Sequence, residues 1–348
     1  MHMADALLSP AVGGTMWAVS AGTIAYCARK VRTDLDDSKV PLMGVLGAFI
    51  FAAQMINFSI PATGSSGHLG GGLLLSILLG PYAAFLTLAS VLVIQALFFA
   101  DGGLLALGCN IFNLGFFPAF IAYPFVYRRL IGAQQTRSRM TMAAIVAAVI
   151  GLQLGAFGVV LETVTSGLSS LPFSTFVVMM QPIHLAIGVV EGFVTAAVAS
   201  FVYKARPELI QFSPEARSTG SRPVRGVLLA FLAIAVLTGG FVSWFASKDP
   251  DGLEWAIAKV TGKEELRAPA QGLLGTLAEV QQKTAVLPDY SFKKPGETGK
   301  DETQPAGQRK NAEGSRLGTS VSGVIGALVT LALALLIGFL LKKRQQAV

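Results

Sequence analysis

Residues 69–100 read LGGGLLLSILLGPYAAFLTLASVLVIQALFFA and carry no charged side chain. A transmembrane helix needs about 20 consecutive apolar residues, so residues 82–100 are long enough to form one. Residues 69–79 form a shorter apolar piece, and Gly80-Pro81 separates the two pieces because proline disrupts a helix interior. The stretch therefore predicts a tight helical hairpin inside a membrane.

The rest of the chain has the same apolar character. Its residues are 53% hydrophobic and only 14% charged, against about 25% charged in an average soluble domain. Uncharged windows of about 20 residues mark further candidate helices. These are residues 11–28, 41–58, 108–127, 141–161, 182–203, 226–245 and 319–341. We therefore predict an all-α integral membrane protein, in which a seven-helix block is followed by two more transmembrane helices that flank a polar extracytoplasmic insert.

The distribution of Lys and Arg indicates how these helices are oriented, because short cytoplasmic loops are enriched in both. If the N-terminus is outside, the loops on the cytoplasmic side contain the basic clusters at 29–39, 128–139, 204–225 and 342–344. The same orientation leaves outside four segments with no Lys or Arg, at 1–10, 59–68, 101–107 and 162–181. We expect a multi-pass protein of the bacterial inner membrane, with a cytoplasmic C-terminus. The net charge of +7 then reflects topology and does not indicate nucleic-acid binding.

Two further features concern processing and catalysis. The chain begins without the basic region and cleavage site of a signal peptide, so we expect Met1 to remain at the mature N-terminus. It contains no Walker A motif and no nucleophile elbow, so we expect no catalytic residues and no ATP hydrolysis in this chain. The insert, residues 246–318, is mixed in composition up to about residue 292 and could fold as a small cap. Residues 293–316 are typical of a disordered linker.

The three histidines of the chain are His2, His68 and His184, and the predicted topology places the first two on the outer side. The dipeptide Met1-His2 offers three nitrogens to one metal: the α-amine, the backbone amide of His2 and its imidazole. His68 can supply a fourth. Four nitrogens in a plane suit Ni²⁺ or Cu²⁺, whereas Zn²⁺ prefers a tetrahedral site. From the residues alone, an incidental His2 and a turn role for His68 remain open.

Other polar residues fall within predicted helices. Glu191 and His184 lie seven residues apart on one helix face, and an intramembrane carboxylate suggests function. We interpret Asn57, His184 and Glu191 as a possible second shell or partner contact. We expect Gln95, Asn110 and Asn113 to join helices through hydrogen bonds, and Cys27 and Cys109 to pack as small apolar residues. Asp101 could be a turn residue or a weak acceptor on the outer side, and we favour the turn.

Two other classes of function fit the sequence less well. A membrane metalloenzyme would hold zinc or iron between His2, His68 and His184, but residues 59–80 contain no carboxylate that could act as a general base. A secondary transporter driven by protons through Glu191 would need an inverted repeat, which a seven-plus-two arrangement does not provide.

Residues 1–205 resemble the CbiM/NikM substrate-capture components of energy-coupling factor importers for cobalt and nickel. The resemblance rests on Met1-His2-Met3 with Asp5, Met55-Ile56-Asn57-Phe58, Ser66-Gly67-His68-Leu69, Leu79-Gly80-Pro81, Gln95 to Gly103, Leu107-Gly108-Cys109-Asn110, His184 to Gly188 and Glu191-Gly192. It implies a seven-helix capture domain whose metal is held by nitrogens of the first two residues and a loop histidine, here Met1, His2 and His68. It also implies a CbiQ/NikQ-like transmembrane coupling subunit and CbiO/NikO-like ATPase subunits as partners. Ni²⁺ or Co²⁺ would be the transported ligand, with no cofactor.

The C-terminal part has a resemblance of its own. Residues 226–341 are similar to the small two-helix accessory component of these importers. The similarity includes Pro250-Asp251-Gly252-Leu253-Glu254 and Leu287-Pro288-Asp289-Tyr290. We therefore expect a capture domain at 1–205, a cytoplasmic linker at 206–225 and an accessory region at 226–348. The fusion resembles the NikMN arrangement and favours nickel over cobalt.

Overall fold

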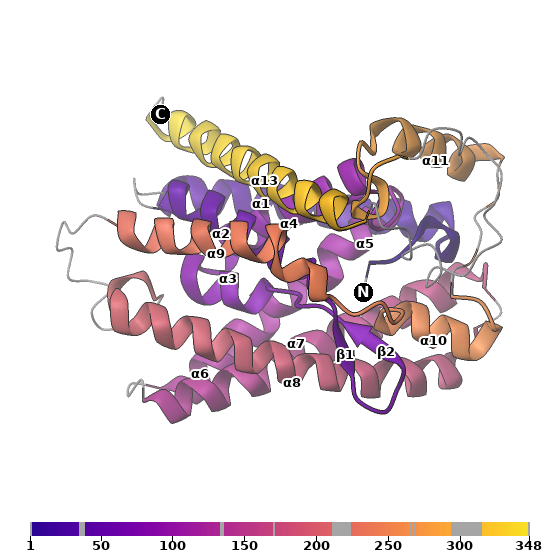
Figure 1. Ribbon diagram of the computed structural model, residues 1–348, viewed down its shortest axis with the longest axis horizontal. Coiled ribbons are helices and arrows are strands. Elements are labelled where there is room, and N and C mark those ends of the chain that lie inside the picture. The colour runs from indigo at the N-terminus through magenta and orange to yellow at the C-terminus, as the bar shows by residue number, and fades with distance from the viewer. Residues whose placement is uncertain are drawn as a thin grey trace.

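The computed structural model describes residues 2–34, 39–132, 136–169, 171–210, 224–264, 266, 269, 271–293 and 315–346. Most of these residues are helical (Figure 1). The long helices are α1 (Pro10–Asp34), α2 (Lys39–Gln54), α4 (Pro81–Phe99), α7 (Arg137–Ser166), α8 (Phe173–Ala205), α9 (Arg225–Gly240) and α13 (Ser315–Gln346). Another runs without a break through α5 (Leu107–Ile111), the π-helical η2 (Phe112–Tyr127) and α6 (Arg128–Ile131). The shorter elements are η1 (Asp5–Leu7), β1 (Phe58–Ile60), β2 (Ser65–Gly67), α3 (Gly72–Leu79), η3 (Pro207–Leu209), η5 (Val242–Phe245), α10 (Gly252–Thr261), α11 (Gly272–Thr284) and η6 (Pro288–Tyr290).

Helices occur at all the predicted places, and the chain is a multi-pass membrane protein. Five helices among the described residues are long and apolar enough to cross a membrane: Pro81–Phe99, Leu107–Ile131, Arg137–Ser166, Phe173–Ala205 and Arg316–Lys343. The apolar helices α2 and α9 are shorter. Helix α3 is wholly buried, and at 1.5 Å per residue its length is only about 12 Å. It therefore cannot cross a hydrocarbon core of about 30 Å by itself.

The hairpin predicted at Gly80-Pro81 is confirmed. Gly80 has φ 81° and ψ 162°, a conformation that a residue with a Cβ rarely adopts. Pro81 is the first residue of α4, where its missing N–H has no helical partner to lose. The chain therefore turns directly from α3 into α4.

Several predicted helix boundaries were wrong, and the structure gives the reason for two of them. The helix expected at 41–58 ends at Gln54, because residues 58–67 leave the helix to form the antiparallel β1–β2 hairpin. The helix expected at 182–203 begins at Phe173 and carries Pro182 inside it. Proline in a membrane helix is tolerated because neighbouring groups can satisfy the freed backbone, so Pro182 does not mark the start of α8.

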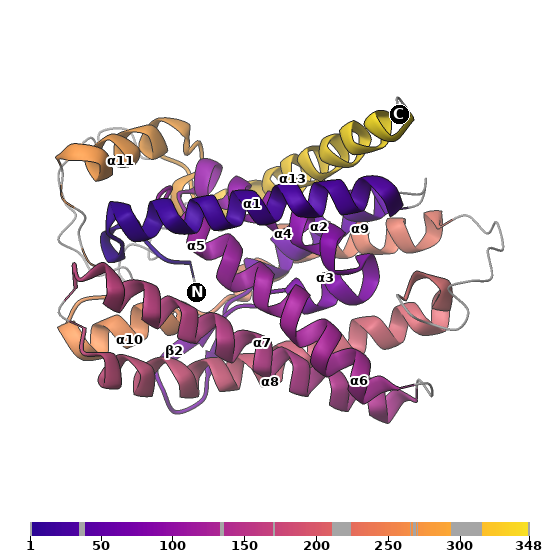
Figure 2. The same cartoon turned by 180° about the vertical axis from the view of Figure 1, so that it is seen from behind.

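The helices of the C-terminal region pack onto the first block through α2. Both α9 and α13 contact α2 and each other, as Figures 1 and 2 show. A Cβ on Gly323 would lie 2.2 Å from the Gly239 carbonyl oxygen, so these glycines let the backbones of α9 and α13 approach closely. Helices α10 and α11 lie toward the same end of the bundle as η1, and the C-terminus lies at the other end (Figure 1).

Candidate metal site

The segment that carries His2 is held in place by the chain around residue 103. Met3 is completely buried, and its N–H donates to Oδ1 of Asn110 over 2.8 Å. Its carbonyl oxygen accepts from Gly103 N at 2.9 Å and from Asn110 Nδ2 at 3.3 Å. The Asp5 carboxylate accepts from the Ala106 N–H at 2.9 Å. These bonds fix the backbone that leads to His2.

Two glycines make this docking possible. A Cβ on Gly103 would lie 1.8 Å from Asp5 Oδ1 and 2.4 Å from the Asp5 backbone nitrogen. Gly102 has φ +81°, and a Cβ there would lie 2.8 Å from Nδ2 of Asn110. Any larger residue at position 103 would therefore displace the N-terminal segment from its packed position against residues 103–110.

The two histidines predicted on the outer side come together. The rings of His2 and His68 stack with centroids 5.0 Å apart and an angle of 9° between their planes. His2 Nδ1 lies 3.3 Å from Asp101 Oδ1, and the other oxygen of Asp101 accepts from the Tyr290 hydroxyl at 2.5 Å. His2 Nε2 is buried and has no hydrogen-bond partner among the described residues. His68 Nδ1 lies 3.1 Å from the Leu69 carbonyl oxygen, a pairing that places the proton on Nδ1 and the lone pair on Nε2.

Burial keeps both imidazoles neutral. It lowers the pKa of His2 below its ordinary value of 6.5 and does so against the nearby charge of Asp101. Burial also lowers the pKa of His68 below 6.5. Neutral imidazole is the form that binds metals, so both rings are in the ligating state at neutral pH.

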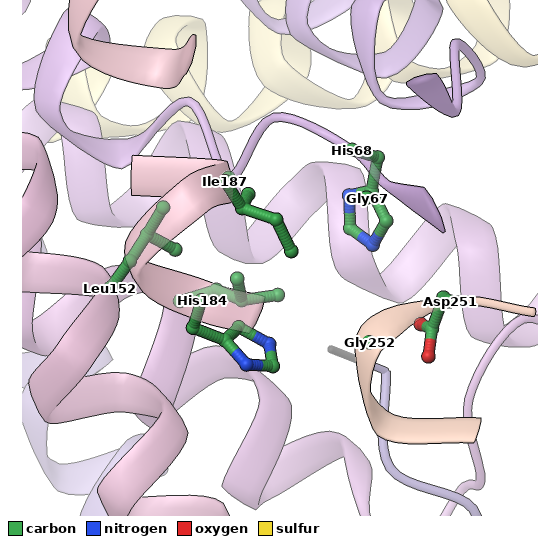
Figure 3. Close-up of a pocket in the computed structure, with 9 residues that line it drawn as sticks. Gly67, His68, Leu152, His184, Ile187, Asp251 and Gly252 are labelled. Carbon is green, nitrogen blue, oxygen red and sulfur yellow. The ribbon is translucent and has the colours of Figure 1, made fainter. Parts of the chain in front are cut away.

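His68 faces a small pocket at the junction of β2, α8 and α10 (Figure 3). The polar side chains that line it are His68, His184 and Asp251, and the apolar ones are Leu114, Leu152 and Ile187. About 10 Å³ is open to the centre of a water-sized sphere, which is room for roughly one water molecule or a single ion. His184 Nδ1 lies 2.8 Å from the Met180 carbonyl oxygen. Its Nε2 is buried and lacks a hydrogen-bond partner within the described part of the chain.

Glu191 holds the backbone that follows His68. Its carboxylate accepts from the N–H groups of Gly70 (2.7 Å) and Gly71 (3.1 Å), where negative charge also complements the N-terminus of α3. Gln54 Nε2 donates to the Gly70 carbonyl oxygen at 2.9 Å, and Gln54 Oε1 accepts from Gln95 Nε2 at 2.9 Å. The loop that presents His68 is thus fixed from α8, α2 and α4.

The other predicted residues have varied positions. Met1 lies outside the described residues. Asn57 acts through its backbone, because its carbonyl oxygen accepts from Ser247 N at 2.7 Å. Asn113 bonds to Glu162 at 2.7 Å and so joins two helices as expected. Asn110 instead holds Met3. Cys27 and Cys109 are buried and form no disulfide.

Sequence reasoning missed the roles of Asp101, Asp251 and Tyr290. Asp101 was interpreted as a turn residue, but its carboxylate pairs with His2. Its place on the predicted outer side, shared with His2, was the available signal. The described residues contain no group of three His, Cys, Asp or Glu side chains that could hold a metal ion.

Comparison with known proteins places this chain in a family. Residues 2–209 match the family described as CbiM, "Cobalt uptake substrate-specific transmembrane region". The chain belongs to the CbiM family. Residues 225–343 match the PDGLE domain, so a PDGLE domain follows the CbiM region.

Relatives of this CbiM-family chain include other fused proteins. The putative fused nickel transport protein NikMN of Archaeoglobus fulgidus is 32% identical over 96% of both chains. The cobalt transport protein CbiM of Geobacter sulfurreducens is 27% identical over 79% of this chain and 82% of its own length. A crystal structure of a transition metal transporter is 31% identical, with a TM-score of 0.53, and covers 62% of this chain and all of its own. The chain is therefore a cobalt or nickel transport component and resembles transport proteins, not enzymes.

Proposed function

We propose that this chain captures Ni²⁺, or Co²⁺, at the outer face of the membrane for an ATP-driven importer of the energy-coupling factor type. The observation that carries the proposal is the docked N-terminal segment, which brings His2 against His68, and His68 lines a buried pocket. The fused relatives named as nickel transport proteins support nickel as the preferred cargo.

The metal ligands in this proposal are the α-amine of Met1, the amide nitrogen and imidazole of His2, and His68. Within the first two residues, the amine and amide nitrogens close a five-membered ring with the metal. Nδ1 of His2 closes a six-membered ring beside it. Nδ1 lies against Asp101 in the structure, so it exchanges this carboxylate for the metal on binding. The resulting plane of four nitrogens suits Ni²⁺ better than Zn²⁺.

Three other residues support the ligands. Glu191 holds the loop of His68, and His184 lines the pocket. Asn57 holds Ser247 through its backbone and so ties the hairpin to the C-terminal region. Because outer-shell partners orient metal ligands and tune their basicity, these contacts contribute to affinity without direct ligation.

The membrane arrangement follows from the distribution of basic residues. Residues 1–205 form the seven-helix capture domain, residues 206–225 a cytoplasmic linker, and residues 226–348 the accessory region with two further helices around the insert at 246–318. The N-terminus is outside and the C-terminus is in the cytoplasm of a bacterial cell, across the inner membrane. A CbiQ/NikQ-like coupling subunit and CbiO/NikO-like ATPase subunits bind the chain and drive release of the metal inward.

The test is Ni²⁺ binding by the purified full-length protein and two variants. His2→Ala removes one ligand and the six-membered ring, so we expect no measurable binding. His68→Ala removes the fourth nitrogen, so we expect binding to weaken severely. Titration against a chromophoric chelator gives both affinities, and thermal unfolding shows that the variants are folded. Wild-type affinity in His2→Ala would show that the proposed site is wrong.

A further inference from the structure

The PDGLE domain reaches the metal pocket through the residues just before α10. Ser66 lies in β2, two residues before His68. It donates its N–H to the Pro250 carbonyl oxygen at 2.8 Å and its hydroxyl to the Asp249 carbonyl oxygen at 2.8 Å. On the other side, a Cβ on Gly252 would lie 3.1 Å from Cε1 of His184. Asp251 lies between these contacts and lines the pocket together with His68 and His184 (Figure 3).

The position of the Asp251 carboxylate is set by α10. Its Oδ1 accepts from the N–H groups of Leu253 (2.8 Å) and Glu254 (2.9 Å). Glu254 in return accepts from the Asp251 N–H at 2.9 Å, which completes a capping box. Trp255, in the first turn of α10, donates to the Thr63 carbonyl oxygen at 3.0 Å and so anchors α10 to the hairpin. The carboxylate is therefore held rigidly beside His68.

A metal held by the proposed ligands, of which His68 lines this pocket, keeps a positive charge that these ligands do not compensate. With one deprotonated amide and neutral imidazoles, a divalent ion retains a net charge of +1. The walls contributed by Leu114, Leu152 and Ile187 cannot solvate it, and an unpaired buried charge is costly. Asp101 contacts His2 from the capture region, and Asp251 is the carboxylate among the described residues that line the pocket.

We propose that Asp251 supplies negative charge that balances the bound metal, so that the PDGLE domain completes the capture site with a carboxylate of its own. The inference rests on the proposed function. The ligand it concerns is a divalent transition metal bound as a monocationic complex with nitrogen ligands. Asp251 acts on this complex through its charge and is not one of the four ligands.

The test replaces Asp251 without removing the helix cap. Asn and Ser cap helices about as well as Asp, so Asp251→Asn and Asp251→Ser keep α10 capped and remove the charge. Asp249→Asn is the matched control, because Asp249 lies two residues away and its carboxylate accepts from Ser59 and Ser247 on the hairpin side. Ni²⁺ affinity is measured by chelator competition on the full-length protein, and the ligand-field absorption band is recorded for each variant.

We expect both Asp251 variants to bind Ni²⁺ more weakly by roughly 10- to 100-fold, the usual effect of losing an outer-shell partner. Asp249→Asn should bind like the wild type. The absorption band should stay in place because the four nitrogens are unchanged. Wild-type affinity in either Asp251 variant, or a shifted band, would overturn the inference while the proposed function stands. Absence of Ni²⁺ binding by the wild type would instead refute the proposed function itself.

Discussion

Replacement of Asn110 by Ala should weaken Ni²⁺ binding although Asn110 is not a ligand. Its side chain makes two hydrogen bonds to the backbone of Met3, which is completely buried. The bond from Asn110 Nδ2 to the Met3 carbonyl oxygen contributes about 1 kcal/mol net, and the Met3 N–H left unpaired by loss of the other bond costs about 1–3 kcal/mol. The docked N-terminal segment would thus lose roughly 2–4 kcal/mol relative to an undocked, hydrated one.

This loss sets the expected size of the effect. Since only the docked segment presents His2 beside His68, the apparent affinity falls with the docked fraction. A penalty of this size corresponds to a decrease in affinity on the order of 30- to 1000-fold if the segment undocks completely. The assay is Ni²⁺ titration of purified protein with its native N-terminus.

Asn113→Ala is the control for the Asn110 variant. Asn113 lies one helical turn further on and bonds to Glu162, so its loss should lower the stability of the fold without displacing the N-terminal segment. Affinity within about twofold of the wild type in Asn110→Ala, a difference of less than ~0.5 kcal/mol, would refute the claim that this docking prepares the site.

Two further predictions concern the same end of the molecule. Gly103→Ala should abolish Ni²⁺ binding, because the new Cβ would lie 1.8 Å from Asp5 Oδ1. Gly14→Ala is the control and should leave binding unchanged, because a Cβ there meets nothing within 4 Å. Equal titration curves for the two variants would contradict this prediction. Acidification should destabilise the metal-free protein, because burial holds the pKa of His68 below 6.5 in the folded state. Below about pH 6.5 the unfolded state therefore binds more protons than the folded state. The free energy of unfolding then falls by up to ~1.4 kcal/mol per pH unit. Thermal unfolding between pH 7 and pH 5 should show a smaller decrease for His68→Gln than for the wild type, and identical decreases would rule out this contribution of His68.

The membrane helices were predictable because hydropathy is a local property of the chain. The uncharged run at 69–100 and the Gly80-Pro81 break were sufficient to place α3 and α4. The end of α2 was not predictable, since Ser66 of the following hairpin finds a backbone partner in Pro250, far along the chain. A sequence window cannot register a contact of that kind.

Only the parts of the site that depend on local sequence could be predicted. His2 and His68 were predicted as metal ligands because the predicted topology places both on the outer side, but the stacking of their rings depends on the docking of Met3. In the sequence, Asn110 resembles a residue that joins two helices. Its hydrogen bonds to the Met3 backbone form only because of the path that the N-terminal segment takes. The sequence Asp251-Gly252-Leu253-Glu254 indicates a capped helix start, yet its place at the pocket depends on contacts with β2 and α8, which are distant in the sequence.

The most direct test of the central claim concerns the N-terminal nitrogen. Ni²⁺ binding is compared between the protein with a free N-terminus and a version in which the α-amine of Met1 is blocked by a formyl group. The formyl group takes up the lone pair of the α-amine, so the amine no longer binds the metal and the five-membered chelate ring cannot form. Our account predicts that only the protein with the free N-terminus binds, with the yellow absorbance of square-planar Ni²⁺. Equal binding by both would remove the amine from the site and contradict the account.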